Sequence, residues 1–205
     1  MAQPEAVLVE NTIHKAIKEA ADKSRVAIDI GAHVGDYSVI MADLFKEVIA
    51  VEPHDLNLED MRKRKHLRDN IIVKQGVIGK HDGITKLYTS NCNPGGHTIS
   101  NLVARLAKWG HEANTFIEVP SWRLDTISKD LDVALIKIDV EGAEEEVLKS
   151  GRDLLLKGPM IALETHGTID TKEIYNFLTG MNYKFFEGSN GVQEIRENNH
   201  YLIKR

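Results

Sequence analysis

The sequence of 205 residues contains a single cysteine, Cys92, which excludes an internal disulfide and a cysteine-rich zinc site. It has no apolar run of membrane-spanning length, and residues 1–25 lack the apolar core of a signal peptide. The excess of acidic residues is small, with a formal net charge of −5, so no chain-wide field attracts nucleic acid or anionic lipid. We therefore expect a cytoplasmic protein with no nucleic-acid partner and no membrane partner.

Apolar runs rich in β-branched residues alternate with stretches of helical character. The runs span residues 26–30, 47–52, 70–78, 133–140 and 160–166. Most are apolar on both faces, which is typical of parallel strands covered by helices. The stretch 36–45 has apolar residues at helical spacing. The stretch 141–150 has acids in its first turn and Lys149 in its last, with Gly151 just beyond it, as helices prefer. We expect one α/β domain over residues 1–205, with helices on both faces of a mostly parallel sheet.

Three segments lie outside this alternation. Residues 1–25 are predicted to contain an N-terminal helix. Segments 183–188 and 200–205 are joined by a polar stretch and are predicted to pair as closing antiparallel strands. Residues 86–121 form a longer connection than a crossover needs, and such connections often bind ligands. This insertion is predicted to be a substrate lid, with an ordinary surface loop as the alternative.

A strand, a glycine turn, a helix and a second strand ending in an acid follow one another between Val26 and Glu52. Nucleotide-binding α/β folds hold their ligand with this order of elements. A dinucleotide site needs G-x-G-x-x-G, whereas this turn reads G-A-H-V-G, with His33 in place of the middle glycine. Asp29 and Asp36 also put negative charge where a pyrophosphate would lie. The pattern favours S-adenosylmethionine (SAM), which has two positive groups at one end and a ribose at the other; a turn without a ligand is the alternative.

Two segments resemble motifs of the FkbM-like family of SAM-dependent methyltransferases. They are AIDIGAHVGDYS at 27–38 and LIKIDVEGAEEEVLKSG at 135–151. Weaker similarity lies in SWRLDTI and IALETH, and the resemblance covers the chain from about Val26 to His166. It implies a Rossmann-like class I methyltransferase fold, in which the last two strands of a seven-stranded sheet pair antiparallel.

The resemblance and the strand positions together indicate which residues bind SAM. The expected residues are Asp29, Gly31, His33, Gly35, Tyr37, Ser38, Glu52, Gly76, Val77 and Asp139. The resemblance implies that the glycine turn holds the methionine end of SAM and that Glu52 binds the ribose. Gly76 and Val77 would lie near the adenine by position alone. His33 departs from the family, which often has a small polar residue such as asparagine there.

Polar residues gather where the fourth and fifth long strands end. The candidate catalytic residues are Lys137, Asp139, Glu164 and His166. His166 could act as a general base toward an acceptor hydroxyl, with Asp139 or Glu164 orienting it. Alternatively, Asp139, Glu141 and Glu164 could hold a divalent metal such as Mg²⁺, which would lower the pKa of the acceptor. A third interpretation is a structural network in which one of these carboxylates pairs with Lys137, because a lysine in a core strand needs an opposite charge.

These observations predict a SAM-dependent methyltransferase. FkbM-like enzymes are associated with hydroxyls of small metabolites, polyketides and sugars, so the resemblance implies O-methylation of a small-molecule or glycan hydroxyl. An NAD-dependent oxidoreductase would share the sheet and Glu52, but it predicts a turn that accommodates a pyrophosphate. A non-catalytic cofactor-binding module would not need the charged strand ends. The sequence gives no indication of the oligomeric state.

Overall fold

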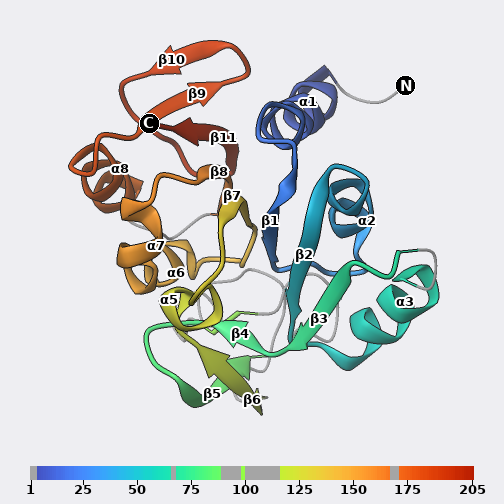
Figure 1. Cartoon of the computed structure of the whole chain (residues 1–205). Helices are drawn as coiled ribbons and strands as arrows, with labels where there is room; N and C mark the ends of the chain where they lie inside the picture. The colour runs from blue at the N-terminus through green and yellow to red at the C-terminus, as the bar shows by residue number, and fades with distance from the viewer. Residues whose placement is uncertain (1–3, 66–67, 89–97, 100–115, 167–170) are drawn as a thin grey trace.

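The computed structural model describes residues 4–65, 68–88, 98–99, 116–166 and 171–205. Its main sheet has eight strands in the order β10-β9-β11-β8-β7-β1-β2-β3 (Figure 1). The parallel part consists of β1 (Asp22–Ile30), β2 (Phe45–Glu52), β3 (Ile71–Gln75), β7 (Val133–Ile138) and β8 (Met160–Thr165). The antiparallel edge consists of β9 (Lys184–Glu187), β10 (Asn190–Val192) and β11 (Asn199–Lys204). The predicted α/β sheet and its closing antiparallel pair, β9 with β11, are confirmed.

Helices cover both faces of this sheet, as Figure 1 shows. One face carries α1 (Pro4–Glu19), α2 (Asp36–Ala42) and α3 (Asp55–Lys65). The other face carries α5 (Leu124–Ile127), α6 (Glu144–Ser150), α7 (Arg152–Leu156) and α8 (Thr171–Thr179). Alternation along the strands divides the core between the two faces, with Ala27 and Leu135 on the α1 side and Ile28 and Ile136 on the α6 side. None of the described helices is long and apolar enough to cross a membrane.

The predicted strand at 70–78 divides into two strands that belong to different sheets. After β3, the short strand β4 (Val77–Ile78) joins β5 (Gly83–Tyr88) and β6 (Phe116–Trp122) in a sheet of order β4-β6-β5. Gly76 lies at the division, with φ of 154°. A Cβ on this residue would lie 2.5 Å from the carbonyl oxygen of Pro120 and 2.6 Å from the Trp122 ring, so only glycine fits beneath β6.

Several predicted boundaries need correction. The sheet has eight strands rather than seven, because Asn190–Val192 of the polar connection pairs with β9. The helix predicted at 141–150 begins at Glu144, because Glu141 and Gly142 have φ of 49° and 92° and cannot continue a right-handed helix. The helix predicted at 36–45 ends at Ala42. Most of the predicted lid at 86–121, namely 89–97 and 100–115, lies outside the described residues.

Candidate active site

The order of the strands brings the predicted site residues to one edge of the sheet. Because β1 lies between β2 and β7, Gly31, Glu52 and Asp139 meet where these parallel strands end. A cavity of about 230 Å³ lies at this edge. Its polar lining includes Gly31, His33, Glu52, Asn57, Asp139, Glu141, Glu164 and His166, and its apolar lining includes Ile30, Val51, Val77, Ile78, Leu87 and Ile99.

The turn after β1 requires glycine at Gly31. This residue has φ of 75°, and a Cβ on it would lie 1.7 Å from the carbonyl oxygen of Asp139. The turn therefore lies directly against the end of β7. Gly35 has φ of 86° and begins α2, packed under the side chain of Met61. Gly31 lines the cavity, whereas Gly35 supports the turn from outside it.

Glu52 holds the glycine turn in place. Its side chain is nearly buried, and its Oε2 accepts a hydrogen bond of 2.9 Å from the backbone N–H of His33. Its Oε1 accepts hydrogen bonds from the N–H of His54 at 2.9 Å and from the amide of Asn57 at 3.0 Å. A carboxylate has about four acceptor positions, so Oε2 keeps one for a ligand in the cavity.

The backbone of His33, rather than its side chain, makes the contact that holds this residue in the turn. Its φ of 51° lies in the left-handed region, where asparagine is among the best-tolerated residues. The imidazole is exposed at the cavity, while the backbone N–H of His33 donates to Glu52. His33 thus adopts a backbone conformation that asparagine also tolerates.

Asp29, Ser38 and Lys137 form a polar group beneath the turn, outside the cavity lining. Asp29 is fully buried and accepts a hydrogen bond of 2.6 Å from the hydroxyl of Ser38. The Nζ of Lys137 lies 3.3 Å from Asp29 and 3.4 Å from Asp139, and it also approaches the carbonyl of Gly31 at 3.4 Å. The ring of Tyr37 lies over the same ammonium, 5.2 Å away.

Lys137 is therefore an ammonium held in a fixed position. Burial by itself lowers its pKa, but the charges of Asp29 and Asp139 outweigh burial and raise the pKa above its usual value. The predicted pairing with Asp139 is confirmed, whereas Glu141 and Glu164 are not its ion-pair partners within the described residues. Because Lys137 does not line the cavity, its geometry suits positioning of the turn and of Asp139 rather than contact with a substrate.

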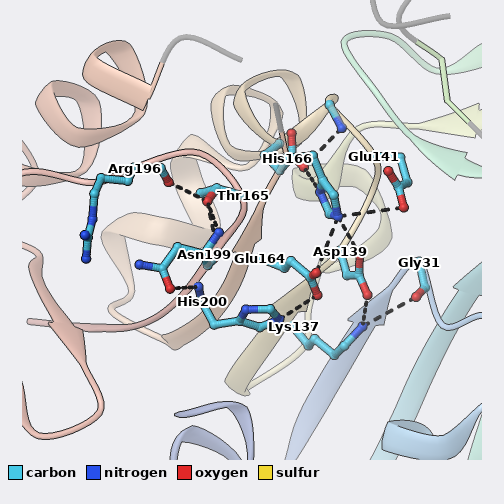
Figure 2. A network of polar contacts seen from close by, with 12 residues as sticks. Gly31, Lys137, Asp139, Glu141, Glu164, Thr165, His166, Arg196, Asn199 and His200 are labelled. Carbon is cyan, nitrogen blue, oxygen red and sulfur yellow. Dashed lines mark hydrogen bonds and ion pairs between the residues drawn. The ribbon is translucent and has the colours of Figure 1, made fainter. Parts of the chain in front are cut away.

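His166 lies at the centre of four carboxylates, a group called here the His166 cluster. Its Nδ1 is 2.7 Å from Oε1 of Glu144, which is fully buried. Its Nε2 lies 3.7 Å from Asp139, 3.7 Å from Glu141 and 3.5 Å from Glu164 (Figure 2). These last contacts are ion pairs that are too long for hydrogen bonds.

The charges of the cluster set the protonation of its members. Burial lowers the pKa of His166, but the hydrogen bond with Glu144 and the nearby carboxylates of Glu164 and Glu141 raise it to about 11. The shift disfavours the role of general base that the sequence suggested for His166, which stays a prediction. Burial raises the pKa of Glu164, but His166 and His200 lower it by a larger amount. The pKa is therefore below its usual value, and this carboxylate stays ionised. Burial is also the main cause of the raised pKa of Glu141.

Strand β11 and the segment just before it, both distant in sequence, hold the end of β8. The Nε2 of His200 on β11 lies 2.8 Å from Oε2 of Glu164, its partner across the antiparallel pair. The hydroxyl of Thr165 donates to the carbonyl of Arg196 at 2.7 Å and accepts from the N–H of Asn199 at 3.1 Å (Figure 2). These contacts fix Glu164 and His166 on either side of Thr165.

The sequence alone did not identify every residue of the site. Asn57 and His200 were missed, and the contact of Glu144 with His166 was not predicted. His200 gave one usable signal, since it is a polar residue in a strand predicted to pair at the sheet edge. Its alignment with Glu164 depends on the register of β8 and β11. Of the other residues predicted to bind SAM, Gly76 and Val77 line the cavity, whereas Tyr37 and Ser38 do not.

The mostly parallel sheet, its closing antiparallel strands and the glycine turn after β1 match the Rossmann-like fold of class I methyltransferases. Comparison with known families agrees with this class. Residues 29–185 match the model of the methyltransferase FkbM domain. The chain therefore belongs to the FkbM family of SAM-dependent methyltransferases, and this membership replaces the oxidoreductase alternative.

Solved structures share the fold at low sequence identity. Methyltransferase FkbM from Methylobacillus flagellatus is similar with a TM-score of 0.60 and 18% identity, over 89% of this chain and 44% of that one. This chain thus spans less than half the length of that protein. An rRNA methylase from Streptococcus thermophilus matches with a TM-score of 0.56 and 10% identity, over 100% of this chain and 97% of the other. SMU.1697c from Streptococcus mutans, in complex with SAH, matches with a TM-score of 0.55 and 13% identity, over 100% and 99% of the two chains. No curated protein matches the chain.

Proposed function

We propose that the chain transfers a methyl group from SAM to a hydroxyl oxygen of a small metabolite or sugar. One observation carries the proposal: the glycine turn and the polar ends of β7 and β8 line the same cavity. A cofactor held by the turn would present its methyl group beside the His166 cluster. Such polar groups are suited to orient a hydroxyl and to accept its proton.

The lining of the cavity fits the parts of SAM. Val77, Ile78 and Leu87 supply an apolar wall for an adenine ring. The open acceptor position on Glu52 suits a ribose hydroxyl. The carboxylates of the His166 cluster favour a cationic sulfonium nearby. The cavity therefore offers apolar, hydroxyl-binding and anionic surfaces in the order that SAM needs.

The proposed reaction places Glu141 as the proton acceptor. Its side chain lines the cavity and is about a quarter exposed, so an acceptor hydroxyl can reach it. Glu141 would accept the proton of the acceptor hydroxyl as its oxygen formed a bond to the methyl carbon. Bound SAM would supply the methyl group and retain the electron pair of the C–S bond on its sulfur. His166 and Asp139 orient the acceptor, while Lys137 keeps Asp139 in place.

The test has two steps, binding and then transfer. Calorimetric titration with SAM, SAH and NAD should give saturable binding of the two adenosyl ligands and none of NAD. Purified protein with methyl-labelled SAM is then offered hydroxyl-bearing metabolites and sugars, with amine analogues in parallel. We expect a methyl ether and SAH in equal amounts, and a loss of at least about tenfold in kcat for Glu141→Gln with SAM affinity unchanged.

The outcomes separate the parts of the proposal. Methylation of the amine analogues alone would refute the choice of oxygen as acceptor. Binding of SAM without transfer to any acceptor, together with an unchanged SAM affinity in Glu141→Gln, would favour the non-catalytic module. Full activity of Glu141→Gln would exclude Glu141 as the proton acceptor.

A further inference from the structure

Three side chains at the ends of β7 and β8 are spaced like ligands of one ion. Asp139, Glu164 and His166 each offer a ligand atom, and these atoms lie within 4.8 Å of one another. The Nε2 of His166 is 3.7 Å from Asp139 and 3.5 Å from Glu164, longer than hydrogen bonds. Bonds of 2.0–2.2 Å to one ion place neighbouring ligands roughly 3 to 3.6 Å apart. A small inward movement of the carboxylates would complete this geometry.

The orientation of His166 matches that of a metal-binding histidine. Such residues bind the ion through one ring nitrogen and donate the other N–H to a carboxylate. Here Nδ1 lies 2.7 Å from Glu144, whose Oε1 is also bonded to the N–H of Gly142 at 3.1 Å. The second oxygen of Glu144 is buried and has no hydrogen-bond partner among the described residues. The charge of this carboxylate is therefore directed at His166, and Nε2 faces Asp139 and Glu164.

Glu164 is held in a similar way. One of its oxygens is bonded to His200 at 2.8 Å, and the other faces His166 at 3.5 Å. Lys137 compensates Asp29 and part of Asp139, but four carboxylates surround the single ring of His166. An added cation would offset this excess of negative charge.

We propose that Asp139, Glu164 and His166 bind a divalent cation on the cavity wall, and that the site prefers a first-row transition metal to Mg²⁺. The imidazole supplies the preference, because nitrogen ligands suit transition metals whereas Mg²⁺ favours an all-oxygen set. This set differs from the sequence-based candidates Asp139, Glu141 and Glu164. Glu141 stays outside it and can accept a proton.

The use of the ion rests on the proposed function. The three ligands line the cavity, so the remaining coordination positions would be open to an acceptor oxygen. A cation there would lower the pKa of a bound hydroxyl and hold it beside Glu141. The binding of the ion itself does not depend on which acceptor is used.

The test measures metal binding directly, on the full chain after treatment with a chelator. Titration with CoCl₂ should show one saturable site and a visible absorption spectrum, and the affinity for MgCl₂ should be at least about tenfold weaker. Glu144→Gln should lower the Co²⁺ affinity about 10- to 100-fold, since Glu144 positions the ligand. His166→Gln should abolish the preference for Co²⁺ over Mg²⁺ and change the visible absorption spectrum of bound Co²⁺. His81→Gln removes an exposed imidazole outside the site and should change neither.

A second variant keeps the test decisive if His166→Gln does not fold, as judged by circular dichroism. His166→Asp creates an all-oxygen set and should narrow the ratio of Co²⁺ to Mg²⁺ affinity at least about tenfold. Equal affinities in the unmodified chain, or a Co²⁺ spectrum that His166→Gln or His166→Asp leaves unchanged, would overturn the proposal. A SAM titration of the same sample separates the two claims. SAM binding without Co²⁺ binding would refute the metal site alone, and Co²⁺ binding without SAM binding would refute the proposed function alone.

Discussion

Carboxylates on the two sides of the cavity differ in how fully the protein satisfies their hydrogen-bonding capacity. Glu52, on the β1–β2 side, accepts three hydrogen bonds of 2.9 to 3.0 Å. Asp139, Glu141 and Glu164, on the β7–β8 side, lie 3.5 to 3.7 Å from the Nε2 of His166. The first side is nearly saturated by the protein itself, whereas the second side keeps hydrogen-bonding capacity for other groups.

This difference separates residues that hold the backbone of the glycine turn from residues that take part in the proposed reaction. On the β1–β2 side, Gly31 and His33 have positive φ, and a firm acceptor is needed to hold that backbone. On the β7–β8 side, groups that exchange a proton or bind a ligand cannot already be fully bonded. Substitutions on the first side should therefore act on SAM binding and stability, and those on the second side on turnover and metal binding.

The largest effect is expected at Gly31, where the two sides touch. Gly31→Ala places a methyl group 1.7 Å from the carbonyl oxygen of Asp139 and also strains a φ of 75°. We expect a loss of more than about 3 kcal/mol in unfolding free energy and no measurable SAM binding. Gly191→Ala is the matched control, because its Cβ would meet only a side-chain atom of Phe186 at 3.9 Å. Thermal unfolding and calorimetry measure both effects, and ordinary SAM affinity in Gly31→Ala would contradict the assigned geometry.

The next effect concerns the ion pair beneath the turn. Lys137→Met leaves Asp29 buried without its opposite charge, which should cost about 3 to 5 kcal/mol in unfolding free energy. The double variant Asp29→Asn with Lys137→Met keeps an acceptor for the Ser38 hydroxyl and removes the buried charge. It should recover more than half of the loss in urea unfolding. A double variant as unstable as Lys137→Met would show that packing, rather than charge, dominates here.

The pair of Asp29 and Lys137 also shows which contacts could not be predicted from the sequence. Local patterns predicted the long strands, the glycine turn and the acid that ends β2, because each depends on neighbours in the chain. Asp29 was expected to contact SAM, and its pairing with Lys137 was missed. The two residues are direct partners across β1 and β7, a register that joins segments more than 100 residues apart. No local periodicity encodes that alignment.

The sequence predicted which polar residues lie at the ends of β7 and β8, but not how they contact one another. The polar strand ends pointed to this edge of the sheet, and the structure does gather Asp139, Glu164 and His166 there. The partner of His166 depends on where α6 begins, and the left-handed backbone at Glu141 and Gly142 delays that start to Glu144. Local charge order had placed the helix start three residues earlier, so Glu144 was not expected to bond to His166.

A smaller effect, confined to one side of the cavity, is expected at Glu52. Glu52→Gln replaces an acceptor oxygen by an amide NH₂, which cannot accept a hydrogen bond from the N–H of His33 or His54. SAM affinity should fall about 10- to 100-fold, while Co²⁺ affinity should stay unchanged. Glu47→Gln, at the other end of β2, is the control. Equal losses in SAM and Co²⁺ binding would show that the two sides are not independent.

The smallest effect is expected at Tyr183, a saturated polar group outside the cavity. Its buried hydroxyl donates to the carbonyls of Leu155 at 2.9 Å and Pro159 at 3.1 Å. Near pH 8, Tyr183→Phe should lower the unfolding free energy by about 1 kcal/mol. Burial raises the pKa of Tyr183 from 10.0 to about 12, although the charge of Arg205 partly lowers it.

The sign of the pH dependence follows from this shift. Between these two pKa values the unfolded chain releases the phenol proton and the folded chain keeps it, so the stability of the unmodified protein falls as the pH rises above 10. At pH 11 the loss is about 1.4 kcal/mol, enough to cancel the advantage over Tyr183→Phe. Urea unfolding of both proteins from pH 8 to pH 11 measures the difference. A difference that stays constant over this range would mean that Tyr183 ionises as readily in the folded chain as in the unfolded one, and that burial beside two carbonyl acceptors does not hold the phenol proton.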